Sequence, residues 1–168
     1  MQELTFPNLM AALNEYGAAV QKVYRDKLVY KDRVASGNLL QSVSYRVDQG
    51  GTIYEVTLSL ASYWKYLETG VAPGGRMPPP SKILEWIIVK PVLPRPDDKG
   101  RIPTPAQLSW AIAKSIQKKG IKGEPLLADT LDEVNAQYRA RIAAAFRLDA
   151  AGILQISALQ TAVYSRLP

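Results

Sequence analysis

Hydrophobic positions in the first part of the chain follow the period of a helix. Over residues 8–30 they recur every three or four positions, as on one face of an amphipathic helix: Leu9, Leu13, Tyr16, Val20, Val23 and Leu28. Residues 31–38 break this period, and Ser36, Gly37 and Asn38 are turn formers. The pattern therefore predicts a helix that is followed by a turn.

The period then changes to two. Apolar and polar residues alternate over residues 43–47 and again over residues 54–60. Between the two segments lie Gly50 and Gly51, which allow the chain to reverse. This alternation predicts two strands that form a hairpin with a longer loop.

A cluster of aromatic residues follows the second predicted strand. The period of two fails from Ala61, and four large side chains lie close enough in sequence to share a helical turn: Tyr63, Trp64, Tyr66 and Leu67. Gly70 can end that turn. We expect most of these side chains to pack in the core, and one aromatic ring to face a neighbouring molecule.

Prolines divide the middle of the chain. Nine of the twelve lie between Pro73 and Pro105, so that residues 71–80 and 91–103 cannot hold regular structure. Between them the sequence predicts a short helix capped by Ser81, with an apolar face made of Ile83, Leu84, Ile87 and Ile88. The second stretch is a long polar loop, a kind that is usually functional or disordered, and it carries Arg95, Asp97 and Asp98.

Two more helices are predicted after the prolines. Thr104 and Pro105 form a strong helix start, and Lys118, Lys119 and Gly120 form a suitable end. The next segment, GIKGEP, has the composition of a linker. A longer helix then begins near Pro125, with apolar residues at near-heptad spacing: Leu127, Leu131, Val134, Tyr138, Ile142 and Ala145.

Gly152 interrupts the pattern of this last helix. Residues 153–168 are too apolar for a free tail, and they include Leu159 and Tyr164. We expect a single α+β domain over residues 1–152 and an apolar extension over residues 153–168 that docks on an adjacent subunit or the next ring. The alternative is that this extension folds back onto its own domain.

Composition limits the possible functions. The chain has 168 residues and is 47% hydrophobic, which suits one packed domain. No run of about 18 apolar residues and no secretory signal is present, so we expect a soluble protein made in the cytoplasm. Cysteine and histidine are both absent, which excludes disulfides, Ser-His-Asp and Cys-His sites and a typical zinc site. We therefore expect no catalytic residue, no cofactor and no metal.

Carboxylates are the remaining candidates for acid or base chemistry. Asp97 and Asp98 form the only adjacent pair, but they lie in a proline- and glycine-rich stretch that is typical of a solvated turn. Glu68 and Glu85 are single carboxylates, and each is interpreted first as a surface or intersubunit salt-bridge partner. An enzyme that uses carboxylates is kept as an alternative.

The net charge of +6 comes from the middle of the chain. Residues 1–60 hold six basic and six acidic residues, residues 61–123 hold eleven and four, and residues 124–168 hold four and five. A basic middle could bind DNA phosphates, which keeps a nucleic-acid-binding domain as a second alternative. The lysines are scattered without interleaved aromatic residues, and this favours solvated faces.

Several segments together resemble one protein family. The sequence SYWKYLETGVAPGGRMPPPSKILEWIIVK follows the paired segments VASGNLLQSVSYRV and TIYEVTLSLA. This order resembles the small neck or tail-completion proteins of long-tailed bacteriophages. Four features match the family. Ser36, Gly37 and Leu39 match a strand-opening step, and Tyr63, Tyr66, Glu68 and Gly70 match an aromatic-acid-glycine segment. Pro78, Pro79 and Pro80 match a proline-marked helix start, and residues 120–130 match the glycine-led entry to a final helix.

The resemblance covers roughly residues 33–133. It departs from the family pattern at Pro125, Leu126 and Leu127, where an aromatic residue and an arginine-proline pair are usual, and residues 153–168 have no counterpart. The resemblance implies an α+β fold, with a small antiparallel sheet packed against N-terminal, middle and C-terminal helices.

In function, the resemblance implies a homo-oligomeric ring in the virion neck. Such a ring is assembled in the bacterial cytoplasm, surrounds the DNA channel, and contacts head-closure or connector proteins and tail proteins. Genomic DNA would be only a non-specific channel contact, and no membrane is involved. A tail terminator stays an alternative to a neck protein. The candidate intersubunit contacts are Tyr63, Trp64, Glu68, Arg95, Asp97, Asp98, Leu159 and Tyr164.

Overall fold

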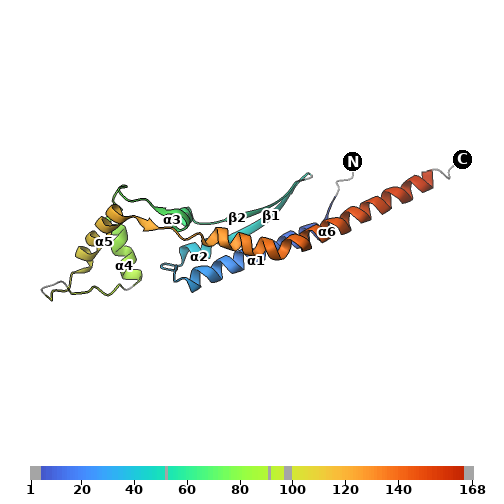
Figure 1. The fold of residues 1–168 in the computed structure, drawn as a ribbon. Coiled ribbons are helices and arrows are strands. Elements are labelled where there is room, and N and C mark those ends of the chain that lie inside the picture. The colour runs from blue at the N-terminus through green and yellow to red at the C-terminus, as the bar shows by residue number, and fades with distance from the viewer. Residues whose placement is uncertain (1–4, 52, 91, 97–99, 165–168) are drawn as a thin grey trace. The chain divides into compact units, whose positions relative to one another are not determined.

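A computed structural model describes residues 5–51, 53–90, 92–96 and 100–164, and for residues 156–164 it describes the backbone alone. The fold is α+β, as predicted. The elements in chain order are α1 (Pro7–Tyr30), α2 (Asn38–Ser42), β1 (Ser44–Gly50), β2 (Ile53–Ser59), α3 (Trp64–Thr69), β3 (Gly70–Val71), α4 (Pro80–Val89), α5 (Pro105–Lys119), β4 (Ile121–Lys122) and α6 (Leu126–Tyr164) (Figure 1).

The chain forms two compact units. The first combines Met1–Tyr24, Ser44–Ser59 and Ala128–Pro168, so it holds most of α1, the β1–β2 hairpin and nearly all of α6. The second combines Arg25–Val43 and Leu60–Leu127. None of the helices within the described residues is long and apolar enough to cross a membrane.

In the first unit, β1 and β2 form the predicted antiparallel hairpin. The register runs from Ser44 opposite Ser59 to Gly50 opposite Ile53. The prediction of a longer loop is wrong, because pairing continues to the glycine. Gly51 has a φ of 62°, in the left-handed region that a tight connection requires.

The N-terminal part of α1 packs against both the hairpin and α6. Gly17 is buried against the ring of Tyr45, so closely that a Cβ atom at this position would overlap the ring. Phe6 stacks on Phe146 at 5.6 Å between ring centroids and meets Tyr54 edge-on at 5.9 Å. These contacts join the three parts of the first unit.

The carboxylate of Asp149, on α6, caps the N-terminus of α1. Its Oδ1 atom accepts from the backbone N (3.2 Å) and Nδ2 (2.6 Å) of Asn8, and its Oδ2 atom accepts from Leu9 N (2.8 Å). First-turn N–H groups have no partner within their own helix, and a negative charge there is favoured by the helix dipole. Burial raises the pKa of Asp149, but the hydrogen bonds from Leu9 and Asn8 lower it, and the net pKa lies below its ordinary value.

Helix α6 continues through Gly152 without a break, so the predicted interruption at this glycine is wrong. A glycine costs about 1 kcal/mol relative to alanine inside a helix, which thirty-nine residues of helical hydrogen bonding can tolerate. Residues 153–164 therefore extend α6.

In the second unit, the Ser-Gly step opens a helix rather than a strand. Gly37, with a φ of 81°, is the N-cap of α2, and the strand β1 begins only at Ser44. The left-handed glycine turns the chain directly into α2, and the alternating pattern starts after that helix.

Strands β3 and β4 form a short antiparallel crossing in the second unit. Gly70 pairs with Lys122, and Val71 pairs with Ile121, so the GIKGEP segment is partly a strand and not only a linker. A Cβ atom at Gly70 or Gly120 would overlap the backbone of the other segment. Both glycines also have positive φ angles, 73° and 71°. The close crossing therefore depends on the absence of side chains at these two positions.

Helices α4 and α5 pack against each other in the second unit. Pro79 is the N-cap of α4 and Pro80 its first residue, so the predicted Ser81 cap is wrong by two positions. The predicted start of α5 is confirmed: Thr104 and Gln107 form a capping box, and Pro105 follows the cap. Both helices thus begin where proline, which lacks an N–H group, causes no loss.

Candidate functional site

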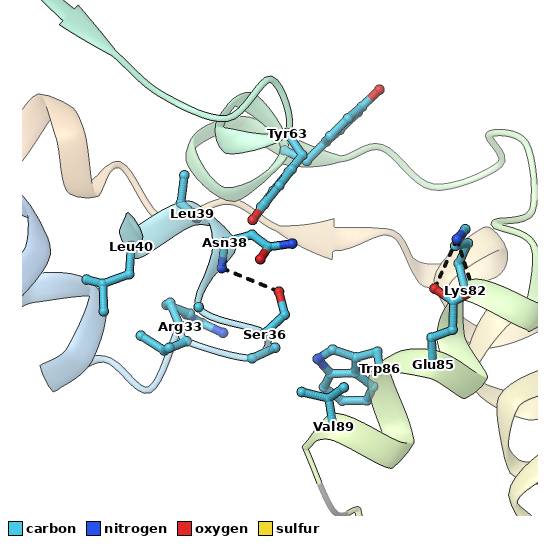
Figure 2. A pocket seen from close by; sticks show the side chains of 14 residues that line it. Arg33, Ser36, Asn38, Leu39, Leu40, Tyr63, Lys82, Glu85, Trp86 and Val89 are labelled. Atoms are coloured by element: carbon cyan, nitrogen blue, oxygen red, sulfur yellow. Dashed lines mark hydrogen bonds and ion pairs between the residues drawn. The ribbon is translucent and has the colours of Figure 1, made fainter. Parts of the chain in front are cut away.

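The second unit contains an open pocket of about 860 Å³. Residues 33–40, which include the start of α2, form one side, and Trp86 and Val89 on α4 lie across from Ser36 and Asn38 (Figure 2). The beginning of α3 contributes Tyr63 and Tyr66. The pocket is formed entirely by residues of this one unit.

Aromatic side chains dominate the exposed surface of this pocket. Ile87 is buried and anchors α4, which leaves Trp86 (40% exposed) and Val89 (52% exposed) on the side that lines the pocket. Tyr66 N donates to Tyr63 O (3.0 Å), and a three-residue spacing places both rings on one side of the turn. Tyr66 is 66% exposed. A surface with three exposed aromatic rings is typical of a site that binds a partner.

The charged groups of the pocket are engaged in ion pairs. Lys82 Nζ lies 2.9 Å from Glu85 Oε2, one helical turn along α4. Arg33 Nη2 lies 2.7 Å from Glu124 Oε2, and Lys31 Nζ lies 3.2 Å from Glu124 Oε1. The hydrogen bond from Arg33 is the main reason why the pKa of Glu124 lies below its ordinary value. Each charged side chain that lines the pocket therefore has an oppositely charged partner.

The turn at residues 36–38 supplies the polar side of the pocket. Asn38 N lies 3.5 Å from Ser36 Oγ, and Gly37 adopts its left-handed conformation between them. The carboxylate of Glu85, on α4 across the pocket from this turn, adds a further hydrogen-bonding group (Figure 2).

The structure places the predicted contact residues in different environments. Tyr63 is the exposed N-cap of α3 and lines the pocket, whereas Trp64 is half-buried at the first position of that helix. Glu68 Oε1 accepts from Leu127 N (2.8 Å) at the start of α6, so this carboxylate caps a helix of its own chain. Arg95 is exposed in the proline-rich stretch. Their intersubunit roles stay predictions.

Four predicted contacts are not placed. Asp97 and Asp98 lie outside the described residues, and so do the side chains of Leu159 and Tyr164.

Sequence reasoning missed Trp86 and Tyr66 as candidates. The available signal was position: Trp86 lies off the predicted apolar face of α4, and a tryptophan off the buried face is a candidate contact.

A second, smaller pocket of about 400 Å³ lies in the first unit, between α1 and α6. It is lined by Leu13, Tyr16, Asn135, Arg139 and Ile142. Tyr16 OH donates to Asn135 Oδ1 (2.8 Å), and burial raises the pKa of Tyr16. Its polar groups serve the packing of the two helices.

Within the part of the chain that the structure describes, no three side chains with metal-binding chemistry cluster together. Comparisons with protein families, with curated proteins and with solved structures find no match to this chain.

Proposed function

We propose that this chain is a structural protein of a tailed bacteriophage. It forms a homo-oligomeric ring in the neck of the virion, which joins or completes the tail, contacts connector and tail proteins, and surrounds the DNA channel. A closed ring of identical subunits requires one heterologous interface that is repeated around the axis.

The observation that carries the proposal is that residues from two of the resembling segments line one pocket. Ser36, Gly37 and Leu39 come from one of these segments, and Tyr63 and Tyr66 come from another. All five line the same pocket. Positions that resemble one family are thus gathered at one surface of the second unit, where a partner can bind.

The aromatic-acid-glycine segment also contacts the glycine-led entry to the final helix. Glu68 accepts a hydrogen bond from the start of α6, and Gly70 pairs with Lys122 in the β3–β4 crossing. These contacts hold the aromatic-acid-glycine segment against the start of the final helix. The proposed role is therefore assembly and not catalysis, and Glu85, already paired with Lys82, is part of a contact surface.

Deleting the gene from the phage that encodes this chain tests the proposal. We expect filled heads and normal-length tails that remain unjoined in electron micrographs, and rescue by the gene supplied in trans. Overlong tails would instead assign the chain as a tail terminator. Joined, infectious particles from the deletion phage would contradict both assignments.

A nucleic-acid-binding role is the second candidate, because the charge is concentrated in one unit. The second unit holds fifteen lysines and arginines against seven aspartates and glutamates, a net charge of +8, whereas the first unit has a net charge of −2. If DNA binding is the function, affinity for duplex DNA should fall by orders of magnitude between 50 and about 200 mM salt, with the protein monomeric. Salt-insensitive or undetectable binding would exclude this role.

A further inference from the structure

We propose that the aromatic pocket of one copy receives the proline-rich segment Val-Leu-Pro-Arg-Pro, residues 92–96, of a second copy. The inference rests on the proposed function, since a closed ring requires one contact between copies that repeats around the axis. It identifies the two surfaces that form the repeated interface.

The pocket has the chemistry that proline-rich segments bind. Recognition of extended proline-rich peptides uses grooves lined by exposed aromatic rings, against which the pyrrolidine rings and intervening apolar side chains pack. Trp86, Tyr63 and Tyr66 provide three such rings, and Val89 continues the apolar surface. The described structure leaves this surface open to solvent.

The segment has the matching conformation and an unburied apolar side chain. Residues 92–96 form neither helix nor strand, and the rings of Pro94 and Pro96 fix φ near the value of an extended polyproline helix. Leu93 is 88% exposed, the highest exposure among the large apolar side chains of the described residues. Such a preorganised segment loses little conformational entropy on binding.

The segment carries one charge, Arg95, and the pocket has one carboxylate, Glu85, together with the cationic side chains of Arg33 and Lys82. Arg95 is exposed directly after Pro94, and the pocket presents the carboxylate of Glu85 next to Trp86. The Glu85 side chain is 63% exposed in its pair with Lys82, so it can accept a second cationic partner. An exposed pair of this kind adds little affinity but sets the direction of the bound segment.

A second copy is the occupant because the segment does not fill the pocket of its own chain. None of the residues that line the pocket belongs to residues 92–96, and Leu93 of the same chain remains in solvent. The contact is thus heterologous: a different surface of each copy is used, and it can repeat around a ring.

Sedimentation velocity of the full chain over a concentration series up to about 1 mM tests the inference. We expect wild-type protein to associate into species larger than dimers. Trp86→Ala, Tyr66→Ser and Leu93→Ser should each weaken association at least about tenfold, as expected for exposed anchors of an interface. Trp110→Ala and Ile102→Ser are matched controls, since these side chains are also exposed, 59% and 66%, but do not line the pocket, and they should associate like wild type.

Sedimentation velocity of an equimolar mixture of Trp86→Ala and Leu93→Ser is the decisive experiment. One variant keeps an intact segment and the other an intact pocket, so the mixture should regain one interface per pair and stop at dimers. A monomeric wild type, unchanged association of the variants, or a mixture that stays monomeric would overturn the inference. In that event the proposed function is judged separately, by whether the phage that lacks the gene still joins its heads and tails.

Discussion

Replacing Asp149 should destabilise the first unit far more than replacing other acidic residues on α6. Asp149 is 7% exposed and accepts three hydrogen bonds from the start of α1. In Asp149→Ala all three donors lose their partner, and the first turn of α1 loses its negative charge. Hydrogen bonds to charged groups are worth about 1.5–3 kcal/mol each, and helix caps about 0.5–2 kcal/mol.

These contributions are not additive, because water can reach part of the freed helix end. We expect a loss of about 2–4 kcal/mol for Asp149→Ala, which is large compared with a typical total of about 5–15 kcal/mol. Asp149→Asn keeps one acceptor oxygen but loses the charge, and should lose about half as much. Asp132→Asn is the control, because Asp132 is exposed on the same helix.

Urea unfolding followed by circular dichroism measures the effect, with an expected midpoint decrease of about 1–2 M for Asp149→Ala at pH 7. The pKa of Asp149 is lowered by folding, so its contribution is complete above the unfolded pKa of about 3.9 and is lost as the pH falls through the folded value. The difference between wild type and Asp149→Asn should therefore shrink below about pH 4. Equal midpoints for Asp149→Ala and Asp132→Asn at pH 7 would refute the capping role.

Three further substitutions probe the backbone and the charges. Gly152→Ala should raise stability by about 0.5–1 kcal/mol in urea unfolding, because the glycine lies inside α6 and an added Cβ atom has no heavy atom within 4 Å; a loss would contradict the continuous helix. Gly120→Ala should lower stability by at least about 1 kcal/mol, because the new Cβ atom would meet the Val71 backbone at a positive φ; an unchanged melting curve would rule out the close crossing. Glu124→Gln should lose less stability than wild type on acidification below about pH 4.3, because the pKa of Glu124 is lowered in the folded state. If stability depends on pH identically in the two proteins, Glu124 makes no such contribution.

Local patterns in the sequence predicted the elements whose signals are local. The periods of α1, the hairpin and α6 are visible within each segment, and Thr104 with Pro105 marks the start of α5. Contacts between distant residues could not be predicted in this way. Asp149 accepts hydrogen bonds from Asn8, 141 residues earlier in the chain, and the GIKGEP segment becomes a strand only because Gly70 and Val71 lie beside it.

The candidate site, too, could be predicted from the sequence only in part. Crowding of the aromatic cluster at residues 63–66 predicted that one ring faces a neighbour, and Tyr63 and Trp64 were the named candidates. The exposed rings are those of Tyr63 and Tyr66. Ile88 was predicted on the apolar face of α4, but it is exposed. Which side of a short, largely apolar helix becomes buried depends on its partner, α5, and the sequence of α4 alone does not contain that information.

Cryo-electron microscopy of the virion proposed to contain this chain tests the central claim most directly. The account predicts a closed ring at the junction of head and tail, into which the two described units of each subunit can be fitted, with the DNA channel at its centre. Complete particles in which the chain is missing, or is found only away from that junction, would contradict it.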